Sequence, residues 1–268
     1  MDGPAPMSAN PPSSKVAITQ AQAKLGPLMA ALADDGVALM AIPTIRIEPP
    51  ADPAPLARAA GNLERYDWVV LTSSNAVQAL AGRRCTPWPD PPRVAVVGRG
   101  TAGTVEAAGG RVDLVPPEEN GAGLVAALLA EFGPAASATR VLLPLSSIAR
   151  RTVPDGLRAA GVRIDEVEAY RTIHDLEGAR RLLQGIADGE ITVLVVTSPS
   201  SVAALAVASE VGFPLSTRAV TLVSIGSATT ALLHEFGRSP EIEATAPGPE
   251  GLAAAIRDAL ERRTGVDG

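Results

Sequence analysis

Short hydroxyl side chains recur where an apolar run ends and a helical stretch begins. The free backbone N–H groups and the dipole of a helix N-terminus stabilise a bound anion by about 0.3–1 kcal/mol per site. One such residue is explained by helix capping alone. Several that face one ligand predict a receptor for a molecule with many carboxylates or phosphates. The candidate residues are Thr72, Ser73, Ser74, Thr101, Ser146, Ser147, Thr197, Ser198, Gly226, Ser227 and Thr229.

A glycine motif offers a competing interpretation. The segment 98–103 reads GRGTAG, so Gly98, Gly100 and Gly103 fit the G-x-G-x-x-G pattern of dinucleotide-binding turns, and Glu118 lies twenty residues beyond Gly98. The related segment that starts at Gly226 keeps only the first of these glycines. An NAD(P)-dependent enzyme is therefore the less favoured alternative. The adjacent Glu118-Glu119 pair is typical of a solvated loop.

Other catalytic groups are scarce. The two histidines, His174 and His234, have no cysteine or carboxylate at the spacing of metal ligands, so we expect no metal site. The G-x-S-x-G elbow of α/β-hydrolases is absent from the sequence. Three arginines, Arg99, Arg150 and Arg151, lie in or near strand-to-helix turns, where a guanidinium can pair with a ligand carboxylate.

Composition limits the class of protein. With 46% hydrophobic and 19% charged residues, the chain can bury a core, which excludes disorder as a description of the whole. A net charge of −6 argues against nucleic-acid or anionic-membrane binding. The single cysteine, Cys85, cannot form an internal disulfide, which favours a reducing, cytoplasmic location. Residues 1–14 carry four prolines and no Lys or Arg, so we expect a disordered tail, and no apolar run is long enough to span a membrane.

The chain contains an internal repeat. Four segments recur 125 to 128 residues later, in the order A, B, A′, B′. The matching pairs are 15–47 with 140–172, 69–77 with 194–202, 94–102 with 221–230, and 121–132 with the stretch around 251–252.

Each repeat alternates short β-branched runs with helical stretches, which predicts parallel sheets covered by helices on both faces. Ten strands predict two five-stranded sheets. The periodicity leaves open whether A joins B or A joins B′. Residues 44–57 and 168–174 are candidate hinges. The predicted strands are 16–18, 38–42, 68–71, 93–97, 112–114, 141–143, 163–167, 193–196, 219–223 and 241–244.

An ordered set of motifs carries a family resemblance. The motifs are YDWVVLTSSNAV, VAVVGRGTA, VEAYRT, VLVVTSPSSV, SIGSATTALLHEFG and GPEGLAAAI. In this order and spacing the chain resembles the uroporphyrinogen-III synthase (HemD-like) family from Lys15 to Leu260. The resemblance implies two flavodoxin-like doubly wound α/β domains joined by a two-segment hinge, with the substrate between them. The implied boundaries are a tail at 1–14, one domain at 15–45 plus 173–264, another at 48–168, and hinge segments at 44–48 and 168–173.

The resemblance also implies a reaction. The substrate would be hydroxymethylbilane, a linear tetrapyrrole rich in carboxylates, which is cyclised with loss of water and inversion of ring D without any cofactor. Tyr170 matches the family tyrosine whose phenol hydrogen-bonds the departing hydroxyl. Thr101, Ser198 and Thr229 match positions that contact substrate carboxylates, directly or through adjacent backbone amides. The implied chain is a monomer that contacts hydroxymethylbilane synthase only transiently.

Two departures from the family pattern keep an alternative open. An arginine is common after the first strand and in the equivalent turn of the second repeat, whereas this chain has Gln20 and Leu145. A non-catalytic module that binds a tetrapyrrole or another polyanion is therefore the alternative function.

Overall fold

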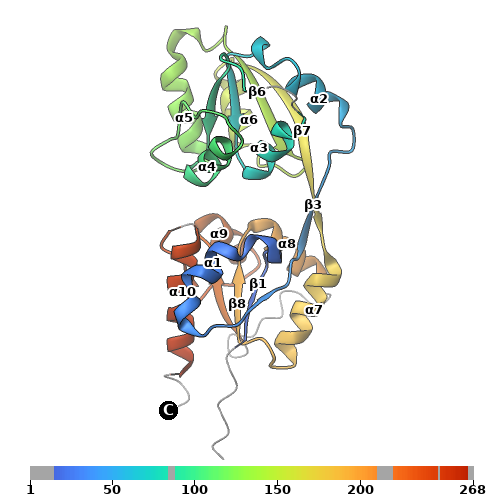
Figure 1. Ribbon diagram of the computed structural model, residues 1–268, viewed down its shortest axis with the longest axis vertical. Coiled ribbons are helices and arrows are strands. Elements are labelled where there is room, and N and C mark those ends of the chain that lie inside the picture. Colours follow the sequence, from blue (N-terminus) through green and yellow to red (C-terminus); the bar gives the residue numbers. More distant parts are fainter. Residues whose placement is uncertain (1–14, 84–87, 210–219, 247, 265–268) are drawn as a thin grey trace, which may run out of the picture. The chain divides into compact units, whose positions relative to one another are not determined.

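A computed structural model of the 268-residue chain describes residues 15–83, 88–209, 220–246 and 248–264. The tail predicted at 1–14 and Cys85 lie outside the described residues. The chain divides into two compact units, unit 1 (1–46 and 174–268) and unit 2 (47–173). The chain leaves unit 1 along strand β3 (Ile45–Glu48) and returns along strand β7 (Arg163–His174), which neighbours β3 in one sheet (Figure 1). The hinge role of residues 44–48 and 168–173 stays a prediction.

Each unit is built on a five-stranded sheet, and the two sheets have the orders β10-β9-β8-β1-β2 and β3-β7-β6-β4-β5. The strands are β1 (Val16–Ile18), β2 (Leu39–Ala41), β3 (Ile45–Glu48), β4 (Trp68–Leu71), β5 (Arg93–Val96), β6 (Arg140–Ser146), β7 (Arg163–His174), β8 (Val193–Val196), β9 (Thr221–Ser224) and β10 (Ile242–Glu243).

Strand order explains the repeat. Numbered along the chain within unit 1, the sheet reads 2-1-3-4-5, the flavodoxin-like order. In unit 2 the strands β7-β6-β4-β5 take the places of β2-β1-β8-β9, with A′ following B in the chain. Unit 1 therefore combines A with B′ and unit 2 combines B with A′. The α/β fold class with two mainly parallel sheets is confirmed.

One predicted strand is wrong. The segment 112–114 contributes only an isolated parallel bridge between Leu114 and Ala95. The carboxylate of Asp113 accepts the backbone N–H of Val94 at 2.8 Å beside this bridge. The fifth strand of this sheet is instead β3, which the sequence analysis assigned to a hinge.

Strand β6 also runs further than predicted. The residues Pro144, Leu145 and Ser146, read from the sequence as a turn, belong to β6 and pair in parallel with β7. Proline cannot donate to a ladder, which is why the sequence pattern suggested an end at residue 143. The register shifts between Leu145 and Ser146, and Ser146 then pairs with Tyr170.

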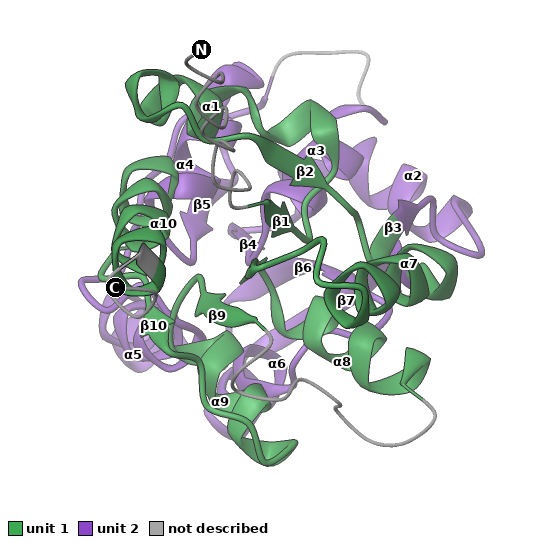
Figure 2. Ribbon diagram, turned by 90° about the horizontal axis from the view of Figure 1, so that it is seen from below, with its two compact units in different colours: residues 1–46, 174–268 green, residues 47–173 purple. Residues whose placement is uncertain are grey.

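Helices cover both faces of each sheet. In unit 1, α1 and α10 lie on one side of the strands and α7, α8 and α9 on the other (Figure 2). In unit 2, α2, α3 and α4 pack on one face, and α5 and α6 on the other. The helices are α1 (Gly26–Ala31), α2 (Ala54–Ala60), α3 (Ser74–Ala81), α4 (Arg99–Ala107), α5 (Gly121–Phe132), α6 (Thr152–Ala159), α7 (Leu176–Ala187), α8 (Pro199–Ala208), α9 (Ser227–Glu235) and α10 (Pro249–Thr264).

Matching glycines in the two units are required by close backbone approach. A Cβ added to Gly123, in the first turn of α5, would collide with the carbonyl oxygen of Glu118. A Cβ added to Gly251, in the first turn of α10, would collide with the carbonyl oxygen of Ala246. A backbone carbonyl cannot rotate away as a side chain can, so both positions exclude larger residues for the same reason. The repeat of sequence is thus a repeat of local structure.

Candidate functional site

The carboxyl end of the unit 2 sheet holds a buried tyrosine. Tyr170 lies on β7 and is 9% exposed, and its hydroxyl oxygen is 3.0 Å from Oγ of Ser73. The backbone carbonyl of Tyr170 accepts the N–H of Ser147 at 3.0 Å, which fixes β7 against the end of β6. Tyr170 also packs in the core formed with α2 and α3. The phenol is therefore held at the edge where ligands bind in open α/β sheets.

Ser73 connects this tyrosine to a helix N-terminus. It is the N-cap of α3 in extended conformation, and its Oγ accepts the backbone N–H of Ala76 at 3.1 Å. The same oxygen bonds to the Tyr170 hydroxyl, so one hydroxyl both caps the helix and orients the phenol. Thr72, which directly follows β4, is half-buried beside it.

A cavity of about 280 Å³ lies within unit 2 against Tyr170. Its walls combine apolar surface with polar side chains on α3 and beyond its C-terminus. This arrangement places the phenol on the wall of a space that a small group can enter. The lining residues are Ile47, Glu48, Pro49, Pro50, Leu56, Asn75, Gln78, Ala79, Arg83, Ala169 and Tyr170.

The N-terminus of α4 already binds a carboxylate, which the chain itself supplies. Oε2 of Glu119 accepts the backbone N–H of Arg99 at 2.9 Å, and a Cβ at Gly98 would collide with that carboxylate. Oε1 of Glu119 lies 3.4 Å from Nε of Arg99. Glu119 lies in an exposed loop, as predicted, and its carboxylate also accepts this hydrogen bond, which the sequence did not indicate. A pyrophosphate would meet this negative charge at the turn, which argues against the dinucleotide reading of Gly98, Gly100 and Gly103.

Two more predicted residues stabilise this end of α4. Thr101 is 7% exposed, and its backbone N–H donates to the carbonyl of Gly98 at 3.1 Å. Ser74 accepts a hydrogen bond from Thr104 at 2.8 Å, and Thr104 Oγ1 also lies 3.1 Å from the Gly100 carbonyl oxygen. These contacts tie the first turn of α3 to the first turns of α4.

Ser146 and Ser147 do not open a helix, contrary to the prediction. Ser146 is the last residue of β6 and its Oγ lies 3.1 Å from the Thr172 hydroxyl, while Ser147 is exposed in the turn that follows. Helix α6 begins only at Thr152. Leu145 is 7% exposed and belongs to the core between α5, α6 and the sheet. A family arginine at that place would have to leave this core, so the leucine here contributes packing.

At the corresponding strand end of unit 1, the hydroxyl groups form hydrogen bonds with one another. Thr197 follows β8, and its Oγ1 and its backbone N–H each lie 3.1 Å from Oγ1 of the buried Thr19. Ser198 is the N-cap of α8 and accepts the N–H of Ser201 at 3.1 Å. Its Oγ also lies 3.0 Å from that of Ser200 and 2.9 Å from that of Ser201. Thr197 and Ser198 thus have structural roles in addition to any role in binding.

The turn before α9 depends on glycine. Gly226 has φ of 157°, a value that L-residues rarely adopt, and it is the N-cap of α9. Ser227, the first residue of α9, is exposed, whereas Thr229 is 1% exposed and donates its N–H to the Gly226 carbonyl at 2.9 Å. Gly226 and Thr229 therefore repeat the geometry of Gly98 and Thr101.

Two of the three candidate arginines are paired with carboxylates of the chain itself. Nη1 of Arg151 lies 2.7 Å from Oε2 of Glu166, and Arg158 pairs with the same carboxylate. The hydrogen bond from Arg151, aided by the charge of Arg158, holds the pKa of Glu166 below its usual range. Arg151 is thus engaged with the chain's own acid, and Arg99 with Glu119.

The part of the chain that the structure describes holds neither a cluster of metal-binding side chains nor a helix suited to a membrane. There, no three His, Cys, Asp or Glu side chains gather closely enough to hold a metal ion. Within the same ranges, no helix has the length and apolar character that a membrane crossing needs.

The fold and this strand-end geometry define a two-unit α/β protein with a buried phenol and many hydroxyl groups at the carboxyl edges of its sheets. Comparison with known families gives the particular one. The family described as uroporphyrinogen-III synthase HemD matches residues 27–254, and the chain belongs to that family.

Relatives support the assignment over nearly the whole chain. The uroporphyrinogen-III synthase of Synechococcus elongatus is 29% identical over 255 residues, covering 92% of this chain and 95% of that protein. The chloroplastic uroporphyrinogen-III synthase of Oryza sativa is 27% identical over 259 residues, covering 94% and 82%. A mutant uroporphyrinogen III synthase from Thermus thermophilus shares the fold with a TM-score of 0.67 at 19% identity, covering 93% of this chain and 99% of that one.

Proposed function

We propose that this chain cyclises hydroxymethylbilane to uroporphyrinogen III, with loss of water and inversion of ring D. Membership of the uroporphyrinogen-III synthase family supports this lyase activity in tetrapyrrole biosynthesis. The single structural observation that carries the chemistry is the Tyr170 hydroxyl, held 3.0 Å from Oγ of Ser73 beside a cavity.

The proposed reaction needs only positioning and one hydrogen-bond donor. The bond between the terminal carbon and its hydroxyl breaks as the adjacent pyrrole supplies electrons, and Tyr170 donates a hydrogen bond to the departing oxygen. The hydroxyl takes up a proton and leaves as water, and the pyrrole nitrogen loses its proton, so the net loss is one molecule of water. Ring D then attacks through its already substituted carbon to form a spiro intermediate, which opens and recloses with ring D inverted. Unaided, the substrate closes without inversion. The protein must therefore restrict a flexible chain to one geometry, a matter of orientation and entropy.

Hydroxyl-bearing turns are the proposed carboxylate ligands. Ser73 and Tyr170 lie at the strand ends of unit 2. In unit 1, Ser198 occupies the position equivalent to Ser73, and Gly226 and Thr229 begin the next helix, α9. The donors fit a substrate with many carboxylates because short hydroxyls and helix N-termini bind anions without requiring fixed cations. The remaining proposed ligands are Thr72, Ser74, Thr101, Ser146, Ser147, Thr197 and Ser227.

The proposed enzyme needs no redox cofactor, because water leaves without any change of oxidation state, and neither another cofactor nor a metal is part of the proposal. A monomeric chain that meets hydroxymethylbilane synthase transiently is part of this proposal, since the substrate is unstable when free. The cytoplasmic location is inferred from the single cysteine and stays a prediction.

The competing function is a non-catalytic binding module of the same family. The absence of arginine at Gln20 and Leu145 favours it, because two cations that could hold carboxylates are missing.

One assay separates the two functions. Hydroxymethylbilane is generated freshly from porphobilinogen, incubated with the chain, oxidised, and separated into type I and type III porphyrin isomers. We expect type III to dominate, whereas the protein-free control gives type I. Type I alone would rule out the activity, and tight substrate binding without type III would identify the binding module.

A further inference from the structure

Unit 2 contains a second cavity at the opposite end of its sheet. Its volume is about 510 Å³, within the range of small-molecule sites. Tyr66 precedes β4, Arg140 begins β6 and Asp165 lies near the start of β7, so these walls belong to the amino ends of the strands. Tyr170 and Ser73 lie at the carboxyl ends. The cavity is therefore separate from the proposed site of cyclisation.

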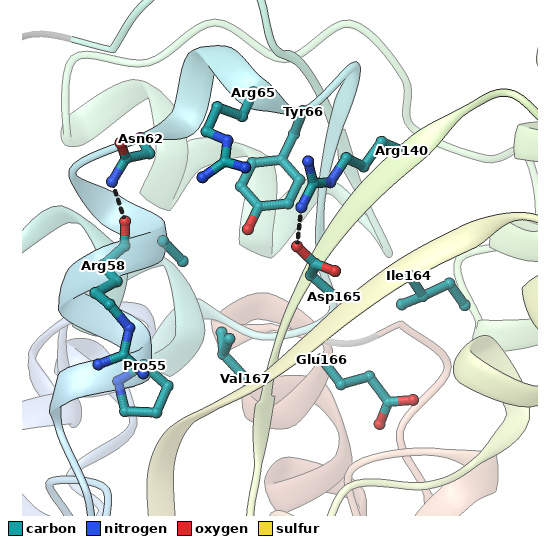
Figure 3. A pocket seen from close by; sticks show the side chains of 11 residues that line it. Pro55, Arg58, Asn62, Arg65, Tyr66, Arg140, Ile164, Asp165, Glu166 and Val167 are labelled. Carbon is teal, nitrogen blue, oxygen red and sulfur yellow. Dashed lines mark hydrogen bonds and ion pairs between the residues drawn. The ribbon is translucent and has the colours of Figure 1, made fainter.

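Arginine side chains dominate the polar wall of this cavity. Figure 3 shows Arg65, Tyr66 and Arg140 close together, and Arg58, which also lines the cavity, extends from α2 beside Pro55. Arg140 is fixed in place, since its Nη2 lies 2.9 Å from Oδ2 of Asp165 and its guanidinium carbon is 5.2 Å from the centre of the Tyr66 ring. This concentration of cations is unusual for a chain of net charge −6.

The carboxylates of the cavity wall are already neutralised. Asp165 is paired with Arg140, and Glu166 is paired with Arg151 and Arg158. Among the described residues, neither the Arg58 nor the Arg65 guanidinium has an acidic partner or a side-chain hydrogen bond. Two positive charges on the wall therefore remain uncompensated.

The phenol of Tyr66 adds a polar group to the same wall. Its side chain is 8% exposed, and desolvation together with the nearby Asp165 raises the pKa of Tyr66, so the hydroxyl keeps its proton. At the end of α2, the side-chain amide of Asn62 donates to the Arg58 carbonyl at 2.7 Å, which ties this segment together. Pro55, Ile164 and Val167 supply apolar surface.

We propose that this cavity binds a small organic molecule with two anionic groups, carboxylates or phosphates, held by the Arg58 and Arg65 guanidinium groups. The planar fork of arginine matches both kinds of group through paired hydrogen bonds. The side-chain amide of Asn62, which has a second N–H besides the one donated to the Arg58 carbonyl, offers a further donor, and the apolar wall accommodates the carbon skeleton. The proposal is independent of the cyclisation reaction.

Calorimetric titration of the full chain tests it, with inorganic pyrophosphate as one probe and succinate as the other, at constant ionic strength. We expect saturable one-site binding of at least one probe. Comparison of the affinities for pyrophosphate and succinate shows whether the site prefers phosphates or carboxylates. The double variant Arg58→Ala/Arg65→Ala should weaken that binding by about tenfold or more.

Matched controls separate a site from a general charge effect. The variant Arg180→Ala/Arg181→Ala removes two exposed arginines from α7 and should bind within about twofold of the unaltered chain, as weak surface effects allow. Tyr170→Phe, at the other end of the sheet, should also bind normally. Absence of saturable binding, equal weakening in both double variants, or full binding by the Arg58→Ala/Arg65→Ala chain would overturn the proposal. Because Arg58 and Arg65 are exposed, equal melting temperatures should verify folding.

Discussion

The two units share the same arrangement of sheet and helices but differ in the side chains at the carboxyl ends of their strands. Ser73 in unit 2 and Ser198 in unit 1 cap equivalent helices, and each accepts a backbone N–H at 3.1 Å. The second partner of Ser73 is the phenol of Tyr170, whereas Ser198 pairs with the hydroxyls of Ser200 and Ser201. The capping serine is therefore explained by the fold, and the tyrosine is the addition specific to unit 2.

A second difference concerns the next helix. The N-terminus of α4 binds the carboxylate of Glu119, while the residue of the other repeat at the same offset is Pro247, which carries no carboxylate and lies outside the described residues. One contact of the matching segments, by contrast, agrees: Asp113 accepts the Val94 N–H at 2.8 Å, and Glu241 accepts the Leu222 N–H at 2.7 Å. The sheets and their helices are thus alike in the two units, whereas the side-chain contacts at the strand ends differ.

The largest expected effect is a loss of stability at the matching glycines of the two units. Gly123→Ala and Gly251→Ala should each destabilise the chain by about 2–3 kcal/mol, because the new methyl group meets a backbone carbonyl. Gly100→Ala is the control, since open space surrounds that position, and it should leave stability unchanged or slightly higher. Urea unfolding measures all three. A loss in only one of the two repeats would show that the units are not equivalent there.

Removing the capping hydroxyl should separate capping from chemistry. Ser73→Ala and Ser198→Ala should each lose about 1 kcal/mol of stability, the usual cost of an N-cap. Ser73→Ala should also lower the rate of type III formation at saturating substrate, because it releases the Tyr170 hydroxyl, whereas Ser198→Ala, which removes a proposed carboxylate ligand, should act on KM and leave that saturated rate nearly unchanged. Thermal unfolding and initial rates, measured on both variants, check this. Equal saturated rates in the two variants would contradict a special role for the Ser73–Tyr170 bond.

Removing Glu119 tests whether the N-terminus of α4 can bind a substrate carboxylate. Glu119→Ala frees the first amide of α4, so a substrate carboxylate can bind there, and KM should fall by about threefold, equivalent to a helix-terminus interaction of about 0.7 kcal/mol. The neighbouring Glu118→Ala is the control and should leave KM unchanged. Steady-state kinetics under identical salt gives the answer. An unchanged KM in Glu119→Ala would mean that the substrate does not use this helix.

The smallest effect concerns acid stability. Because Arg151 and Arg158 lower the pKa of Glu166, this carboxylate stabilises the fold at pH above its ordinary value of about 4.3 and loses that contribution as the pH falls further. Glu166→Gln should cost up to about 1 kcal/mol at pH 7. The difference in melting temperature between the two chains should shrink towards pH 3. A difference that stays constant with pH would exclude the ion pair as its cause.

Much of the frame was predictable because it depends on local patterns. Continuous apolar runs gave β1, β4 and β8 with the bounds observed, and the repeat together with the family resemblance gave the α/β fold and the activity. Proline at 144 hid the length of β6, since its missing donor does not end this parallel strand. The segment 112–114 was misread as a strand because its short apolar pattern does not reveal that only Leu114 pairs with the sheet.

The strand ends were harder to predict because their contacts join distant segments. Twenty residues separate Glu119 from Arg99, and 97 separate Ser73 from Tyr170. The only available signal for Glu119 was its position directly before Asn120, the N-cap of α5. The burial of Leu145 depends on the register of β6, which no local pattern reports.

The most direct test compares Tyr170→Phe with the unaltered chain in the rate of type III isomer formation from fresh hydroxymethylbilane. Loss of one hydrogen bond to the departing hydroxyl should slow the enzyme about tenfold, with little change in melting temperature because the ring still packs in the core. If the rate of type III formation is unchanged, Tyr170 serves only as packing and the proposed role of unit 2 in the chemistry is wrong.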